Sequence, residues 1–395
     1  MAAGLTNQGT AALDAALAGH VEQGEVPGLV ALVARGEDVH VTAAGHKAFG
    51  DPGPIGRDAI FRIASMAKPI VGAAAMLLVE DGAMALDDPV ARWLPELAEP
   101  RVLRTPESRL DDTVPADRPI TVEDALSFRL GFGNIMSPGQ YPVVAAESKL
   151  GLKTLGPPWP PSALTPDEWI AALASLPLMD QPGTRWRYNT SATVAGVLIE
   201  RVAGMPLADV LQQRIFAPLG MADTGFHVPA SKLARFTTFY APNGPGGSLR
   251  VIDEPDGWYA TPPKLPDAAS WLVSTIDDLH RFTTMLTAGG GGLLSAESVR
   301  EMTRDRMTDR DRAESAIFVG EHGGWGLMMR VPRAGGGPDD RPGGYGWDGG
   351  SGTTWRTDPA TGLTGILLTQ RQATSPAPSA LVTDFWALAY AALDG

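Results

Sequence analysis

A run of ten uncharged residues, Ile70 to Val79, most constrains how this chain can fold. It is apolar on every side of a helix, which is typical of a helix buried at the centre of a domain. Gly82 predicts where that helix ends, because glycine readily adopts the left-handed conformation that follows many helix C-termini. The run is well short of the ~20 residues that a membrane-spanning helix needs. We therefore expect it inside the core of a soluble protein.

A serine and a lysine stand three positions apart just before this run, as Ser65 and Lys68. Positions i and i+3 lie on one face of a helix, so both side chains would point into one small volume. A serine hydroxyl is a weak nucleophile without a neighbouring base, and a lysine can be that base where burial lowers its pKa. Alternatively, Ser65 caps the helix and Lys68 is solvated; spacing and context leave both interpretations open.

Two later segments offer groups for the same chemistry. Tyr188 follows the turn 181–187 and precedes a helical pattern; a tyrosinate beside a lysine ammonium is a competent base. Taken alone, Tyr188 is more simply a structural residue at a loop–helix junction. The segment 343–353 contains a Gly-x-Gly-x-x-Gly spacing, but no strand and helix frame it as in dinucleotide-binding proteins. Its glycines better fit a strand edge that a substrate approaches closely.

Composition excludes several other chemistries. The 395 residues include no cysteine, and the six histidines lack metal-ligand spacing, so we expect no disulfide, no metal and no cofactor. A net charge of −13 argues against nucleic-acid or membrane partners, which attract basic patches. The first eight residues lack the basic and apolar regions of a signal peptide. A cytoplasmic location is the default expectation.

The predicted elements are β-rich at both ends of the chain and helical in the middle. Strands at 28–35 and 39–44 form a predicted hairpin. Later strands are expected at 324–331, 352–357 and 364–370, before a helix at 379–393. Between them, helices are expected at 10–21, 121–126, 165–176, 191–203, 207–215 and from 274, and loops at 98–120, 131–166 and 241–268. This pattern indicates a sheet assembled from both ends around a helical insertion.

In this order the Ser-x-x-Lys, the tyrosine and the late glycine-rich strand resemble the serine β-lactamase and penicillin-binding-protein-like superfamily. The likeness is greatest to its class C β-lactamase-like branch and to the family VIII carboxylesterases. It extends over nearly the whole chain, and further blocks carry it at 86–90, 182–183, 216–221, 274–279 and 324–327.

The resemblance implies an α+β fold, in which an antiparallel sheet flanked by helices joins an all-helical inserted domain. The expected division is 1–98 with 285–395 for the α/β domain and 99–284 for the mainly helical one. The active site would lie between them.

The resemblance also implies roles for individual residues. Ser65 would be the acylated nucleophile, and Lys68 and Tyr188 would share the work of general base and acid. Backbone N–H groups of Ser65 and Gly350 would form the oxyanion hole, where donors stabilise the charge that develops during reaction. The substrate-binding residues would be Trp347, Asp348 and Gly349.

The chain departs from the β-lactamase pattern at its Lys-Thr-Gly motif, which aligns with Trp347, Asp348 and Gly349. The lysine that would attract a β-lactam carboxylate is therefore a tryptophan, as in family VIII esterases. An indole offers apolar surface and one N–H donor but no charge, which favours neutral esters. The Tyr-x-Asn pattern is also broken, so Asn189 receives no role.

Three arginines keep the β-lactam alternative open, since Arg185, Arg187 or Arg356 could hold an anion. Our main hypothesis is a metal-independent serine carboxylesterase that acts on small esters through an acyl-enzyme. A second hypothesis keeps the same site for a β-lactam, a D-amino-acid peptide or another amide, or transfers the acyl group to an acceptor other than water. A non-catalytic binding protein is disfavoured by the intact catalytic set. The oligomeric state stays open.

Overall fold

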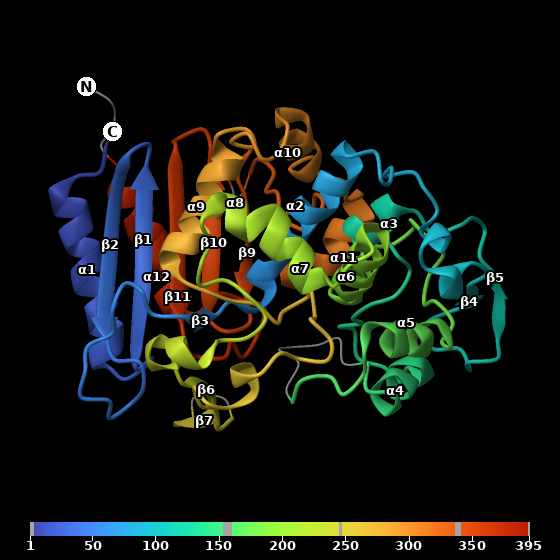
Figure 1. The fold of residues 1–395 in the computed structure, drawn as a ribbon, viewed down its shortest axis with the longest axis horizontal. Helices are drawn as coiled ribbons and strands as arrows, with labels where there is room; N and C mark the ends of the chain where they lie inside the picture. The colour runs from blue at the N-terminus through green and yellow to red at the C-terminus, as the bar shows by residue number, and fades with distance from the viewer. Residues whose placement is uncertain (1–3, 153–159, 245–246, 336–340, 394–395) are drawn as a thin grey trace.

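The computed structural model describes residues 4–152, 160–244, 247–335 and 341–393. Its largest sheet has five strands in the order β2-β1-β11-β10-β9 (Figure 1), and all neighbouring pairs are antiparallel. The strands are β1 (Gly28–Arg35), β2 (Asp38–Gly45), β9 (Tyr345–Gly349), β10 (Thr353–Asp358) and β11 (Leu363–Thr369). Because β1 pairs with β11, the two chain ends share one sheet. The predicted α+β fold is confirmed.

Helices cover both faces of this sheet. On one face α1 (Asn7–Glu22) and α12 (Ala380–Ala391) pack against each other and against the strands. On the other face lies α9 (Ile276–Thr287), in front of the strands in Figure 1. Successive residues of β1 belong to two different hydrophobic cores. Leu29 packs in the core beneath α1 and α12, and Val30 packs in the core beneath α9. This double burial explains the unbroken apolar sequence of β1.

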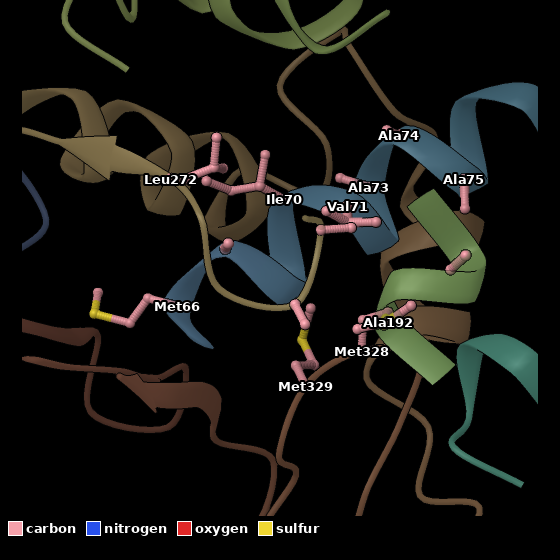
Figure 2. Packing of buried hydrophobic residues seen from close by; sticks show 14 of the residues in the cluster. Met66, Ile70, Val71, Ala73, Ala74, Ala75, Ala192, Leu272, Met328 and Met329 are labelled. Atoms are coloured by element: carbon pink, nitrogen blue, oxygen red, sulfur yellow. The ribbon is translucent and has the colours of Figure 1, made fainter. Parts of the chain in front are cut away.

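Helix α2 (Ala67–Glu80) is buried from its first residue to Leu78, as its uncharged sequence predicts. It packs against α6 (Thr190–Ala203), and Figure 2 shows Ala192 of α6 and the pair Met328 and Met329 gathered around it. The backbone approach is close at Gly72, where a Cβ atom would lie 2.9 Å from the Met328 Cβ.

The remaining helices and small sheets complete the chain. The helices are α3 (Val122–Leu126), α4 (Pro142–Lys149), α5 (Pro166–Ala174), α7 (Leu207–Leu211), α8 (Ala217–Leu219), α10 (Ala296–Met302) and α11 (Asp309–Val319). The two-stranded sheets are β3 (Phe61–Arg62) with β8 (Val273–Ser274), β4 (Arg101–Leu103) with β5 (Thr113–Pro115), and β6 (Phe239–Pro242) with β7 (Leu249–Asp253). No helix in these described ranges is both long and apolar enough to cross a membrane.

Three stretches predicted as loops contain regular structure. Strands β4 and β5 lie within 98–120, α4 lies within 131–166, and β7 lies within 241–268. Residues 153–159 and 245–246 of these stretches lie outside the described residues. The elements are short, so proline and glycine nearby outweighed their weak apolar pattern.

The predicted strand at 324–331 was wrong. Only isolated bridges from Arg330 to Trp325 and Gly346 occur there, and Met328 has a φ of 65°. Helix α11 was missed because its first half is almost entirely charged and the helix carries no apolar stripe. The capping box of Thr308 with Asp311 was the feature of the sequence that could have predicted this helix.

The domain boundaries at 98/99 and 284/285 stay a prediction.

Candidate active site

Ser65 lies where strand β3 turns into α2. It sits on a single 3-10 turn, Ala64–Met66, and α2 itself begins at Ala67. Ala64 has a φ of 45°, a backbone conformation that costs energy in a residue other than glycine. The turn leaves Ser65 partly exposed in the wall of a cavity.

Lys68 lies in the first turn of α2 and is 0% exposed. Its Nζ is 2.8 Å from the Ser65 Oγ and donates a 2.6 Å hydrogen bond to the Ala269 carbonyl oxygen. Burial lowers the pKa of Lys68 to about 7, although the Asp267 carboxylate opposes this shift. At neutral pH a large fraction of this amine is therefore neutral and able to accept the Ser65 proton.

Asp267 organises the turn that holds Lys68. Its Oδ1 accepts hydrogen bonds from the Thr193 hydroxyl (2.7 Å) and the Ala269 N–H (3.1 Å), and its Oδ2 accepts one from Ser270 (3.2 Å). These contacts fix the carbonyl of Ala269 against the lysine. Sequence reasoning missed Asp267, which stands in a predicted loop about 200 positions from Lys68; an aspartate accepting from an amide two residues on is a common turn.

Tyr188 precedes α6 and lies beside the other two side chains. The Lys68 Nζ is 4.8 Å from its ring centroid, and its hydroxyl accepts a 2.8 Å hydrogen bond from the Trp347 Nε1. Desolvation raises the pKa of the Tyr188 phenol well above its usual value, although hydrogen bonds with Ser65 and Trp347 oppose the shift. Tyr188 is therefore a neutral phenol at rest, and not the tyrosinate that the sequence suggested.

Aromatic rings fix the positions of Tyr188 and Trp347. Trp325 meets Trp347 edge to face at 4.7 Å, and Phe318 lies 4.6 Å from the Tyr188 ring. Trp186 stacks on Tyr188 at 5.8 Å. Sequence reasoning did not identify Trp325 or Phe318 as neighbours of Tyr188, because contacts between residues far apart along the chain leave no pattern in a single sequence.

Strand β9 passes directly behind the Ser65 turn. A Cβ atom at Gly349 would lie 2.3 Å from the Ile63 carbonyl oxygen, so this position requires glycine. The next turn carries Gly350, which lines the cavity. Ser351 donates a 2.5 Å hydrogen bond to the Arg62 carbonyl, and the Thr353 hydroxyl donates to that of Ile63 at 3.2 Å. These hydroxyls tie the turn that carries Gly350 to the turn that carries Ser65.

The three arginines left open by the sequence are all paired with carboxylates. Arg185 and Arg187 both contact Asp180 and border a separate hollow. Arg356 makes a bidentate pair with Asp348, at 2.5 and 2.8 Å. None of the three is therefore available as a bare cation at Ser65.

Ser65, Tyr188 and Trp347 line one cavity of about 550 Å³, a size suited to a small ligand. Its lining also includes Asn134, Met136, Phe318, residues 371–379, Leu381 and Val382. Asn189 also lines it, with a φ of 86° at the start of α6.

Two features of the lining bear on what the cavity can bind. Asn134 is 9% exposed, and its Oδ1 is a buried acceptor with no hydrogen-bond partner among the described residues. No cluster of three or more potential metal ligands occurs in the described part of the chain.

Comparison with known proteins gives consistent findings. The family model described as Beta-lactamase matches residues 13–385. Protein Rv1367c of Mycobacterium tuberculosis (strain ATCC 25618 / H37Rv) is 37% identical over 361 residues, 88% of this chain and 87% of that protein. Esterase EstB of Burkholderia gladioli is 31% identical over 388 residues, 91% and 90% of the two chains. The structure of EstCE1, described as a hydrolase with promiscuous acyltransferase activity, superposes with a TM-score of 0.81 at 23% identity, covering 97% and 99%.

Proposed function

The chain belongs to the beta-lactamase family, and we propose that it is a serine hydrolase that cleaves small carboxylic esters through an acyl-enzyme on Ser65. The observation that carries the proposal is Lys68, a fully buried amine 2.8 Å from the Ser65 Oγ with its pKa lowered to about 7. A serine with such a base beside it is an activated nucleophile.

In the acylation step the neutral Lys68 amine takes the Ser65 proton as Oγ attacks the ester carbonyl carbon. Backbone N–H groups of Ser65 and Gly350 stabilise the oxyanion. When the tetrahedral intermediate collapses, the alkoxide leaves and takes a proton from the Tyr188 phenol. The phenolate regains a proton from the Lys68 ammonium, which returns the base to its neutral form.

In the deacylation step a water molecule attacks the acyl carbonyl. The neutral Lys68 amine takes its proton. When the tetrahedral intermediate collapses, the Ser65 oxygen leaves and takes a proton from the Tyr188 phenol, which regains one from the Lys68 ammonium. The acid leaves, and the net change is one ester bond hydrolysed with no cofactor consumed. The high pKa of Tyr188 suits a proton donor to an alkoxide, since an alcohol is a still weaker acid.

Trp347 is proposed to act on this chemistry through Tyr188. Its indole N–H donates to the phenol oxygen at 2.8 Å, and this hydrogen bond strengthens when the phenol gives up its proton. The indole adds no charge, so it assists the proton transfer without attracting an anionic substrate. This supports a neutral ester over a β-lactam.

Acyl transfer to an alcohol is the second candidate. Ser65, Met136 and Leu381 all line the cavity of about 550 Å³, a volume that leaves room for an acyl group and a small acceptor together. The relatives agree with either outcome, since one carries the name esterase and the other is described as having acyltransferase activity.

The test compares a short-chain p-nitrophenyl ester with a chromogenic cephalosporin, with and without added alcohol. We expect ester cleavage with little β-lactam opening, loss of turnover in Ser65→Ala, and retention in the control Ser148→Ala, whose serine is exposed on α4. Mass spectrometry of a quenched reaction should find the acyl group on Ser65. Unchanged turnover in folded Ser65→Ala would overturn the proposal.

A further inference from the structure

Asp348 and Arg356 form a charged pair at the edge of the cavity. They project from the neighbouring strands β9 and β10, where Asp348 stands opposite Thr354. The two carboxylate oxygens contact the two Nη atoms at 2.5 and 2.8 Å, the bidentate geometry that makes such pairs strong. The Asp348 side chain is 38% exposed and the Arg356 side chain 12%.

The two members of the pair face the cavity unequally. Asp348 is among its lining residues, next to Trp347, whereas Arg356 does not belong to the described lining. Successive residues of a strand project to opposite faces of the sheet, so Asp348 borders the cavity on the face of β9 opposite the Trp347 indole. Its carboxylate is the more exposed member of the pair, and the guanidinium is the more buried one. The positive charge of Arg356 is therefore paired with a carboxylate and largely covered.

Arg356 has anchors that do not depend on Asp348. Its Nη1 donates to the Thr354 hydroxyl (3.1 Å) and to the Trp355 carbonyl (3.0 Å). Its guanidinium carbon lies 5.6 Å from the centroid of the Trp386 ring. The arginine should consequently hold its place when the carboxylate in front of it loses its charge.

The other charged residues of the described lining are Glu25 and Arg371. The Glu25 carboxylate pairs with His20 at 3.1 Å, and the Arg371 Nη1 donates to the Glu25 carbonyl oxygen at 3.0 Å. Both lie on segments outside β9. Asp348 is therefore the charged lining residue adjacent to Trp347 in the chain.

We propose that Asp348 is a specificity-determining residue that makes the site favour neutral esters over esters carrying a carboxylate, because it presents a negative charge to the cavity and covers Arg356. This inference rests on the proposed ester hydrolysis and names the substrate class of that site. The preference has two sources, repulsion by the Asp348 carboxylate and loss of the attraction that Arg356 would otherwise exert.

The test uses esters of equal length, p-nitrophenyl butyrate and mono-p-nitrophenyl succinate. Asp348→Asn removes the charge and keeps the shape. We expect it to raise the ratio of kcat/KM for the anionic ester over the neutral one by ~10-fold or more, as expected for a charge pair a few ångströms apart at intermediate dielectric. The double variant Asp348→Asn/Arg356→Gln should lose most of that gain.

The control is Asp277→Asn, which breaks a bidentate pair with Arg57 that is not part of the described cavity lining. It should leave the ratio unchanged. If the asparagine variant does not fold, as judged by circular dichroism, Asp348→Ser makes the same change of charge. A rise of less than ~2-fold in the folded variant would overturn the proposal.

A binding measurement separates this inference from the proposed function. In the Ser65→Ala background, tryptophan fluorescence is titrated with dimethyl succinate and with monomethyl succinate. Asp348→Asn should again improve the relative affinity for the anionic ester by ~10-fold. If the wild type hydrolyses neither p-nitrophenyl ester, the proposed function fails, and this affinity ratio still confirms or overturns the role of Asp348.

Discussion

Replacing Lys68 by methionine should abolish catalysis and, at the same time, stabilise the protein in a pH-dependent way. Lys68 is 0% exposed and its pKa falls from 10.5 in the unfolded chain to about 7 in the folded one. Between these two values the unfolded state binds more protons than the folded state. Stability of the wild type therefore rises with pH through this window and is lowest below pH 7.

The magnitude follows from the shift. One pKa unit corresponds to ~1.4 kcal/mol, so burial of Lys68 costs about 5 kcal/mol at pH 6 and about 2 kcal/mol at pH 9. Methionine removes this pH-dependent cost. It also loses the hydrogen bond to the Ala269 carbonyl, a loss of about 1–3 kcal/mol that is nearly independent of pH.

The assay is urea unfolding of wild type and Lys68→Met at pH 6 and pH 9. The difference in unfolding free energy between variant and wild type should be about 3 kcal/mol more favourable to the variant at pH 6 than at pH 9. Lys149→Met, at an exposed position of α4, is the control and should show no such pH dependence. A difference for Lys68→Met that is the same at both pH values would refute the assigned burial and pKa.

Further predictions concern catalysis. The kcat/KM of the wild type should rise with pH through about 7, as Lys68 loses its proton. Asp267→Asn should move this rise to lower pH by ~1 unit or more, because the Asp267 carboxylate raises the pKa of Lys68. An unchanged pH profile in a folded variant would contradict this interaction between Asp267 and Lys68. Trp347→Phe removes the hydrogen bond to Tyr188 and should lower kcat by ~10-fold or more. A pre-steady-state assay would show whether acylation or deacylation is slowed. An unchanged kcat would mean that the indole has a packing role alone. Ser351→Ala loosens the tie to the Ser65 turn and should lower kcat by ~10-fold with KM nearly unchanged, whereas a rise in KM alone would place Ser351 in substrate binding.

Local chemistry alone determined part of this protein. The three-residue spacing of Ser65 and Lys68 brings their side chains to 2.8 Å, because helical geometry converts spacing into proximity. The bounds predicted for β1 are those observed, and the predicted helix at 121–126 begins at its cap, Thr121. Such features depend on residues within one turn or one strand, which a reader of the sequence sees together.

The tertiary structure decided the protonation states and the charge pairing of these residues. The pKa of Lys68 depends on complete burial and on Asp267, which lies about 200 positions away and is brought near by the packing of α2 against α6. The sequence left Arg356 open as an anion site, and only the pairing of β9 with β10 sets Asp348 against it. Tyr188 was a candidate tyrosinate until its desolvation and the Trp347 indole were in view. In each case the deciding quantity is the desolvation of a side chain or its electrostatic interaction with a group on another element. Its sign and strength follow from distance and burial, which strand register and core packing alone establish.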